Sequence, residues 1–343
     1  MISSGTLKIL GYSTFGVLLL LAAVFCLERI GHIDMAFQTF LILKSGSLEI
    51  QSGRFGAAVT QAWPWAAQAL HLPLRGVLLA YSIGHVAWPL AVFAWCCWLG
   101  ARQWAAVLLL LLTGMSTHTF YWLSEMPQGL VFLVGLMAYA GADFAARGLA
   151  ERPGATLRFY AHALGFAAAV ATAFYFHPLL MYALVFACGF VLLGAPDAAR
   201  RRLHVAMLAL LACTVFVKYR LLRLDWYDAV AVERAENFRR LWPHWLDLQS
   251  HRDLLGHLVG DYWFVAAAWL LNTAFFFWKK RWLSALWVGL YPIGYVFLVN
   301  VPYHESTHQF YMENLWLPLG FFAAVPLVLE VLPGCASART AAG

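Results

Sequence analysis

Residues 16–34 read GVLLLLAAVFCLERIGHID, an apolar run that stops at a cluster of ionisable residues. The run closes a stretch long enough to cross a bilayer, which takes about 20 apolar residues. Glu28, Arg29, His32 and Asp34 follow close together, in a chain of which only 12% of the residues are charged. Two interpretations are open: the polar end that any membrane helix needs, or the rim of an active site.

The composition of the whole chain is that of an integral membrane protein. Of its 343 residues 62% are hydrophobic, and the mean hydropathy is +0.70. Soluble domains carry about a quarter charged residues, so a soluble globular class is excluded. The net charge of +6 does not indicate nucleic acid as a partner, because Lys and Arg report topology in membrane proteins. The six cysteines show no spacing typical of a metal cage or a disulfide framework.

We predict an all-α, polytopic membrane helical bundle that forms a single integral membrane domain over residues 1–343. The first apolar stretch lacks a small-residue cleavage site, so we expect a retained span rather than a signal peptide. About ten stretches are long and apolar enough to be spans. They cover approximately 9–28, 77–99, 104–122, 128–146, 158–176, 178–195, 204–218, 262–279, 282–300 and 314–332.

The distribution of charge favours N- and C-termini on the cytoplasmic side of the cell (inner) membrane. With the N-terminus inside, every predicted inner segment carries Lys or Arg, whereas the short outer loops 123–127, 176–178 and 301–313 carry none. Most acidic residues and most histidines fall on the outer side, so we expect the activity there. No Asp, Glu, Lys or Arg lies at the centre of a predicted span, which disfavours an ion-coupled transporter.

Two long outer segments, 29–76 and 218–261, are amphipathic and predict interfacial helices. In the first segment we expect a short helix over 34–43, a turn at 45–47 and a second surface helix that carries Arg54 and is interrupted at Pro64. Capping of the bundle is the alternative role. In the second segment Arg239 and Arg240 either bind phosphate or pair with acidic neighbours and lipid headgroups.

This order of spans and loops resembles the C-type superfamily of membrane glycosyltransferases. The family pattern has a first outer loop built from two surface helices, with an essential acidic residue soon after the first span. Members often carry a second acidic residue in the loop after the third span. In this chain Asp34, with Glu28 nearby, and Glu125 in TFYWLSEMPQG fill these positions. The chain resembles a compact bacterial relative of this family rather than a named enzyme.

The resemblance implies transfer of a sugar from a polyprenyl-phosphate-linked donor to a glycan, lipid or protein acceptor. We expect Asp34 to be the catalytic base that takes the proton of the acceptor hydroxyl. Glu28 and Glu125 would shape the acceptor or metal side. The departing lipid phosphate needs positive charge or hydrogen-bond donors, and Arg54 is the first candidate. Arg239, Arg240 and His177, in the turn FHP, follow it. Membrane lipid is the remaining expected partner.

The last outer loop, 301–313, contains HESTH and so matches the H-E-x-x-H pattern of zinc metalloproteases. His304, Glu305 and His308 are therefore open to three interpretations: a zinc protease site, binding of phosphate or sugar by a glycosyltransferase, or a hydrogen-bonded loop that closes an outer cavity. No cofactor is established, and a divalent metal ion is the open alternative. A transporter or lipid flippase is the third functional hypothesis. His85 and His162, within predicted spans, are expected to be polar contacts between helices.

Overall fold

The computed structural model is built from helices, and the residues that it describes contain no strand. A helix occupies each of the ten apolar ranges predicted from the sequence. This confirms the all-helical class. The described residues are 3–31, 33–114, 120, 123–142, 156–194, 198–304 and 309–335.

The contacts of the chain divide it into two compact units, which we describe separately. The N-terminal unit comprises Ile2–Leu112 and His118–Pro178, and the C-terminal unit comprises Leu179–Gly343 with Met1 and Thr113–Thr117. The N-terminal unit contains two 3-10 turns, η1 (Gln51–Gly53) and η2 (Phe55–Ala57). Its α-helices are α1 (Ser4–Val24), α2 (Cys26–Ile30), α3 (Ile33–Ser45), α4 (Ala58–Ala69), α5 (Leu74–Trp98), α6 (Arg102–Thr113), α7 (Glu125–Ala142) and α8 (Thr156–Phe176).

Helix α5 is the centre of the N-terminal unit and packs against α1, α2, α4 and α7. Glycines allow two of these contacts to be very close. A Cβ atom on Gly11 of α1 would lie 2.0 Å from the ring of Phe93, and one on Gly84 of α5 would lie 2.5 Å from Trp63 of α4. Small residues at helix crossings are typical of membrane bundles, because lipid supplies no hydrophobic force between helices.

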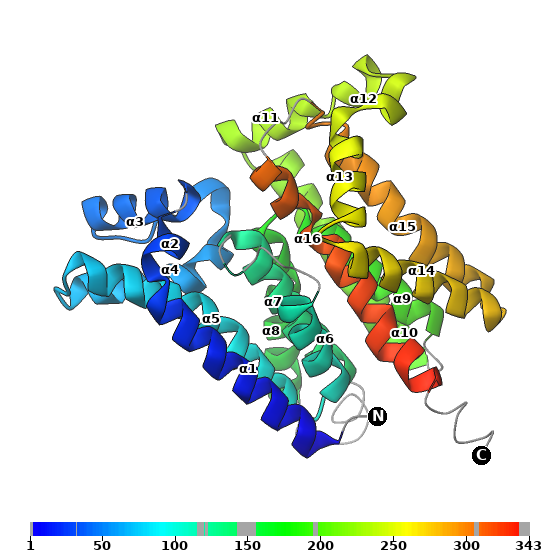
Figure 1. Ribbon diagram of the computed structural model, residues 1–343, viewed down its shortest axis with the longest axis horizontal. Helices are drawn as coiled ribbons and strands as arrows, with labels where there is room; N and C mark the ends of the chain where they lie inside the picture. The colour runs from blue at the N-terminus through cyan, green and yellow to red at the C-terminus, as the bar shows by residue number, and fades with distance from the viewer. Residues whose placement is uncertain are drawn as a thin grey trace. The chain divides into compact units, whose positions relative to one another are not determined.

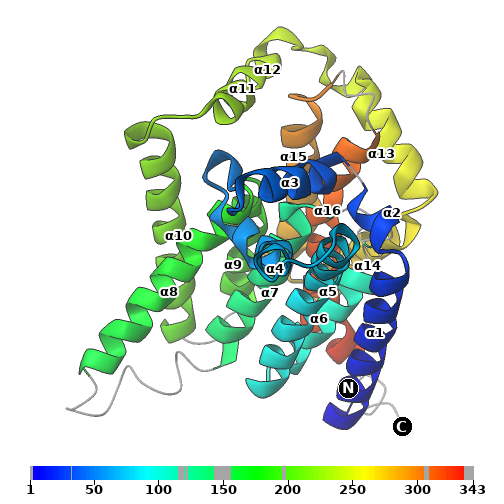
Figure 2. The ribbon, with the colours of Figure 1, turned by 90° about the vertical axis from the view of Figure 1, so that its left-hand side faces the viewer.

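The first loop segment, residues 29–76, contains the two expected helices, α3 and α4. The course of α4 at Pro64 and the place of Arg54 differ from the prediction. Figures 1 and 2 show α3 lying crosswise to α1. The turn after α3 contains Gly46 at φ +69°, whose carbonyl oxygen accepts a hydrogen bond from Trp65 Nε1 at 3.1 Å. Helix α4 continues through Pro64, because packing against α5 outweighs the hydrogen bond that proline removes. Arg54 precedes α4, between η1 and η2, rather than lying on the helix.

The C-terminal unit contains the second group of apolar helices (Figure 1). Its α-helices are α9 (Leu180–Gly194), α10 (Ala198–Phe216), α11 (Trp226–Arg234), α12 (Asn237–Arg240), α13 (Gln249–Val259), α14 (Trp263–Trp278), α15 (Trp282–Asn300) and α16 (Gln309–Pro326). The π-helical turns η3 (Val217–Leu221) and η5 (Leu327–Val331) continue α10 and α16, and η4 (His244–Asp247) is a 3-10 turn.

Buried polar side chains connect the helices of the C-terminal unit. Asn300, at the end of α15, donates to Ser250 O of α13 at 3.2 Å, and its Oδ1 accepts from Trp316 Nε1 of α16 at 2.9 Å. Lys218 of η3 forms an ion pair with Asp228 of α11, with 2.7 Å between Nζ and Oδ2. Both members of this pair are buried, so it fixes the entry into the long segment that follows α10.

Five helices of the described residues are long and apolar enough to cross a membrane, as expected for a membrane protein. They are Ser4–Val24, Leu74–Trp98, Arg200–Leu221, Trp282–Asn300 and Asn314–Cys335. A sixth is obtained if α13 and α14, bent by 87°, count as one broken span. The prediction of about ten spans is therefore not confirmed, since several of the predicted ranges hold shorter helices.

The two predicted polar contacts between helices are confirmed within the N-terminal unit. His85 Nδ1 of α5 lies 3.4 Å from Gln128 Nε2 of α7. His162 Nδ1 of α8 lies 3.4 Å from the Tyr139 hydroxyl of α7. These contacts join α7 to its neighbours on two sides.

We predict that Gly84→Ala lowers the free energy of unfolding by about 1–3 kcal/mol, because the added methyl group overlaps Trp63. Thermal unfolding in detergent measures the change. Gly16→Ala is the matched control, since a Cβ atom at Gly16 of α1 meets nothing within 4 Å. Equal melting temperatures for the two variants would contradict the close α4–α5 contact.

Candidate active site

Helix α3 presents one buried face, and the first candidate residue lies at its start. Met35, Gln38, Thr39 and Ile42 recur at helical spacing and are all buried, so this side packs against the unit. Met35 forms a small core with Ile30, Tyr81 and Leu123. Asp34 is in the first turn of α3 and is exposed.

Arg29 anchors the chain just before this helix. Its side chain is 1% exposed, and its Nε donates to the Phe120 carbonyl oxygen at 2.7 Å. Nη1 donates to both the carbonyl oxygen and the hydroxyl of Ser82, each at 2.8 Å. The guanidinium also lies over the Phe120 ring, 4.3 Å from its centroid. Arg29 therefore ties the exit of the first helix to α5 and to the segment that leads into α7.

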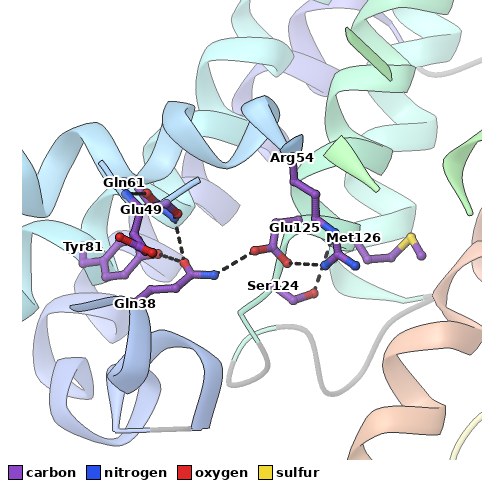
Figure 3. A network of polar contacts seen from close by, with 8 residues as sticks. All are labelled: Gln38, Glu49, Arg54, Gln61, Tyr81, Ser124, Glu125 and Met126. Carbon is purple, nitrogen blue, oxygen red and sulfur yellow. Dashed lines mark hydrogen bonds and ion pairs between the residues drawn. The ribbon is translucent and has the colours of Figure 1, made fainter. Parts of the chain in front are cut away.

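Glu125, the first residue of α7, is a buried carboxylate with donors from the first loop segment. Glu125 is only 6% exposed. Gln38 Nε2 donates to Glu125 Oε1 at 2.8 Å, and Arg54 Nη1 lies 3.5 Å from Glu125 Oε2 (Figure 3). A negative charge at this position is also favoured by the positive end of the α7 dipole. The carboxylate thus joins α3 and the η1–η2 segment to α7.

The amide of Gln38 extends this network to α4 and α5. Its Oε1 accepts from the Tyr81 hydroxyl at 2.7 Å and from Gln61 Nε2 at 3.1 Å (Figure 3). The Gln61 amide also contacts the backbone of Glu49: its Nε2 donates to the Glu49 carbonyl oxygen at 2.8 Å, and the Glu49 N–H donates to Gln61 Oε1 at 2.9 Å. Glu125 and Asp34 both lie close enough to Tyr81 for their negative charges to act on its hydroxyl. Asp34 is therefore within electrostatic reach of the buried network.

A second buried cluster lies one turn further along α7. The Thr60 hydroxyl of α4 donates to Gln128 Oε1 at 2.8 Å, and Gln128 Nε2 faces His85 of α5. Trp88 Nε1 donates to the Gln128 carbonyl oxygen at 3.2 Å. Buried polar contacts of the N-terminal unit thus continue along α7 beyond Glu125, and they are made mostly by uncharged groups.

Arg54 is brought to the site by the turn that precedes it and by packing onto the end of α8. Ser52 and Gly53 have φ values of +53° and +67°, which reverse the chain before Arg54. A Cβ atom on Gly56 would lie 2.2 Å from the Phe176 ring, so glycine is required for this approach. The positive charge of Arg54 acts on His177, which follows α8.

The candidate residues fall into different parts of the molecule. Arg54 and Glu125 form an ion pair, and Asp34 and His177 lie in the same N-terminal unit. The charge of Arg54 acts on His177, and the charges of Asp34 and Glu125 both act on Tyr81. Glu28 is exposed on α2, beside the buried Arg29.

The other candidates belong to the C-terminal unit. Arg239 and Arg240 are exposed on α12, and Arg240 Nη2 pairs with Glu236 Oε2 at 2.9 Å. His304 is partly buried in the turn after α15, whereas Glu305 and His308 lie outside the described residues.

The described residues do not fit a bound divalent metal ion. Among them, no group of three His, Cys, Asp or Glu side chains gathers as a metal site would require. Both oxygens of Glu125 already face nitrogen donors, from Gln38 and Arg54.

Sequence analysis missed the side chains that organise the site. Gln38, Gln61 and Gln128 carry amides and Tyr81 a neutral hydroxyl, whereas the candidates predicted from the sequence are Asp, Glu, Arg and His residues. Arg29 was recognised only as part of the polar boundary. The available signal was the presence of amide side chains in otherwise apolar helices, where a buried polar group needs a partner.

Comparisons of the chain with protein-family models, with curated proteins and with solved structures gave no match. The resemblance to the C-type glycosyltransferases therefore stays a prediction.

We predict that Arg29→Met lowers the free energy of unfolding by about 2–5 kcal/mol, since the Phe120 and Ser82 carbonyl oxygens lose a charged donor. Arg102→Met, at an exposed position of α6, is the matched control. Thermal unfolding in detergent compares the two. Similar melting temperatures would show that Arg29 is not an anchor.

The environment of His177 predicts that the free energy of unfolding depends on pH. Burial lowers the pKa of its imidazole well below the ordinary range, and the charge of Arg54 lowers it further. Below about pH 6.5 the unfolded chain therefore binds a proton that the folded chain does not. The free energy of unfolding should fall as the pH decreases in that window, by up to about 1.4 kcal/mol per pH unit.

His177→Asn should reduce this slope when unfolding is followed between about pH 5 and pH 8. His244→Asn, at a histidine whose side chain is 75% exposed, is the control and should keep the wild-type slope. An unchanged slope in His177→Asn would contradict the environment assigned to this imidazole.

Proposed function

We propose that this protein is a membrane glycosyltransferase that moves a sugar from a polyprenyl-phosphate-linked donor to an acceptor hydroxyl on the extracytoplasmic face. One observation carries the proposal. Glu125 is held by Gln38, which lies four residues after Asp34 on the same helix, and by Arg54. The two acidic residues and the cation selected from the sequence therefore belong to one connected part of the N-terminal unit.

Asp34 has the properties of the catalytic base. It is exposed, so an acceptor can reach it, and it begins α3 next to the buried network. In the proposed reaction the acceptor oxygen forms a bond to the anomeric carbon while Asp34 takes its proton. The bond between the anomeric carbon and the phosphate oxygen breaks, and the lipid phosphate leaves with the electron pair.

Arg54 supplies positive charge for the leaving phosphate. Its guanidinium is oriented by the ion pair with Glu125 and keeps a side-chain exposure of 14%. A fixed cation at the site stabilises developing negative charge without reorganisation, which is the most effective form of electrostatic catalysis. Glu125 has a supporting role in this scheme, since both of its oxygens are used to hold Gln38 and Arg54.

The topology belongs to the same proposal. Three shorter apolar helices, Arg102–Thr113, His162–Phe176 and Leu180–Gly194, would be spans together with their neighbouring residues. With α7 (Glu125–Ala142), the five long helices and the bent pair, they would complete ten spans. Both termini would lie on the cytoplasmic side of a bacterial inner membrane. Asp34 and Glu125 would then face the outside, where lipid-linked sugar donors are used.

We predict that Asp34→Asn abolishes transfer, because the amide cannot accept the proton of the acceptor hydroxyl. Mass spectrometry of lipid-linked sugars and surface glycans would compare cells carrying the wild type or the variant at equal membrane levels. The donor should accumulate and its product should fall by at least about 100-fold, the usual contribution of a general base.

Asp247→Asn is the control, since the side chain of Asp247 is 74% exposed in the C-terminal unit. It should leave both pools unchanged. Unchanged profiles in Asp34→Asn would overturn the proposed function, and transport of an unmodified substrate by that variant would indicate a transporter or flippase.

A further inference from the structure

The hydrogen bonds around Gln38 have a direction that is set by the protein backbone. The Glu49 N–H can only donate, and it lies 2.9 Å from Gln61 Oε1. The Glu49 carbonyl oxygen can only accept, and it lies 2.8 Å from Gln61 Nε2. These two contacts exclude a flipped amide at Gln61, because the flip would face donor against donor and acceptor against acceptor.

This direction passes from Gln61 to Gln38 and then to Glu125. Since Gln61 Nε2 donates, the atom of Gln38 at 3.1 Å from it must be the amide oxygen. The Tyr81 hydroxyl donates to the same oxygen at 2.7 Å. The Gln38 amide nitrogen therefore faces Glu125 Oε1 at 2.8 Å, where the carboxylate can only accept.

The same side chain also sets the position of Asp34. Residues four apart lie on one side of a helix, so Asp34 and Gln38 share a side of α3. Gln38 is buried and makes contacts with α4, α5 and α7 through Gln61, Tyr81 and Glu125. Rotation of α3 would break all three hydrogen bonds.

We propose that Gln38 is a positioning residue: its amide nitrogen fixes Glu125 Oε1 as the acceptor of their hydrogen bond, and its buried contacts fix the helix α3 that carries Asp34 in its first turn. The hydrogen bonds from Gln61 to Gln38 and from Gln38 to Glu125, which we call the lock, are a property of the fold. Their role in sugar transfer rests on the proposed function. Arg54 from the η1–η2 segment pairs with Glu125, and the negative charges of Glu125 and Asp34 both act on Tyr81 of α5. Gln38 places an amide nitrogen against Glu125 Oε1, so that no second carboxylate oxygen occupies this position.

The test exchanges the amide of Gln38 and the carboxylic acid of Glu125 between the two positions. Gln38→Glu keeps an acceptor for Tyr81 and Gln61 but places a second carboxylate oxygen against Glu125. Two such carboxylates repel each other unless they share a proton. We expect the melting temperature to fall by several degrees at neutral pH and to recover as the pH is lowered. The double variant Gln38→Glu/Glu125→Gln restores one acid facing one amide, and it should recover the wild-type melting temperature.

The matched control is Gln68→Glu on α4, a position where the amide nitrogen donates to the Leu43 carbonyl oxygen at 3.0 Å. This change also places a carboxylate oxygen against an acceptor, but that acceptor is a backbone oxygen and not Glu125. Addition of Glu125→Gln should give it no recovery. Failure of Glu125→Gln to restore the stability of Gln38→Glu, or equal restoration of both variants, would overturn the lock. If Gln38→Glu alone does not accumulate, accumulation of the double variant supports the lock and its loss overturns it.

Activity is measured separately on the restored double variant. Because its negative charge has moved from α7 to α3, next to Asp34, we expect transfer to fall by at least about tenfold while stability is retained. Full transfer by a stable double variant would leave the lock intact and overturn its role in the reaction. Absence of transfer in the wild-type protein would instead overturn the proposed function.

Discussion

A buried carboxylate in an apolar bundle has to find its donors within the protein, and Glu125 imposes this constraint on the N-terminal unit. Burial of an ionised group without partners costs several kcal/mol or more. Two donors are supplied by residues that precede Glu125 by a long stretch of chain, with Gln38 lying 87 positions away. The first loop segment therefore folds back onto α7, and the turn at Ser52 and Gly53 brings Arg54 to the same point.

Polar contacts of this kind replace much of the hydrophobic force that holds a soluble protein together. Lipid is as apolar as the helix surfaces, so close packing and internal hydrogen bonds decide which helices associate. Arg29 fastens the exit of α1 to α5, and Asn300 connects three helices of the C-terminal unit. Glycines at Gly11 and Gly84 allow the close approaches that complete the packing.

The two acidic residues of the candidate site, Glu125 and Asp34, differ in their burial. Glu125 is buried and fully engaged, so it supports Arg54 and the helix that carries Asp34. Asp34 is exposed, and in the proposed function it takes the proton of the acceptor. Pre-organisation of this kind is what transfer to a hydroxyl would require, since the reacting groups must be held in place before the substrate arrives.

The sequence by itself determined the helical membrane class, the ten helical ranges, the turn near Gly46 and the acidic candidates Asp34 and Glu125, because hydropathy and charge are local properties. Only the tertiary structure decided that Arg29 is buried, that α4 continues through Pro64 and that an amide joins α3 to α7. Whether an uncharged side chain such as Gln38 is solvated or satisfies a buried group depends on residues distant in the chain. A local pattern carries no record of those partners.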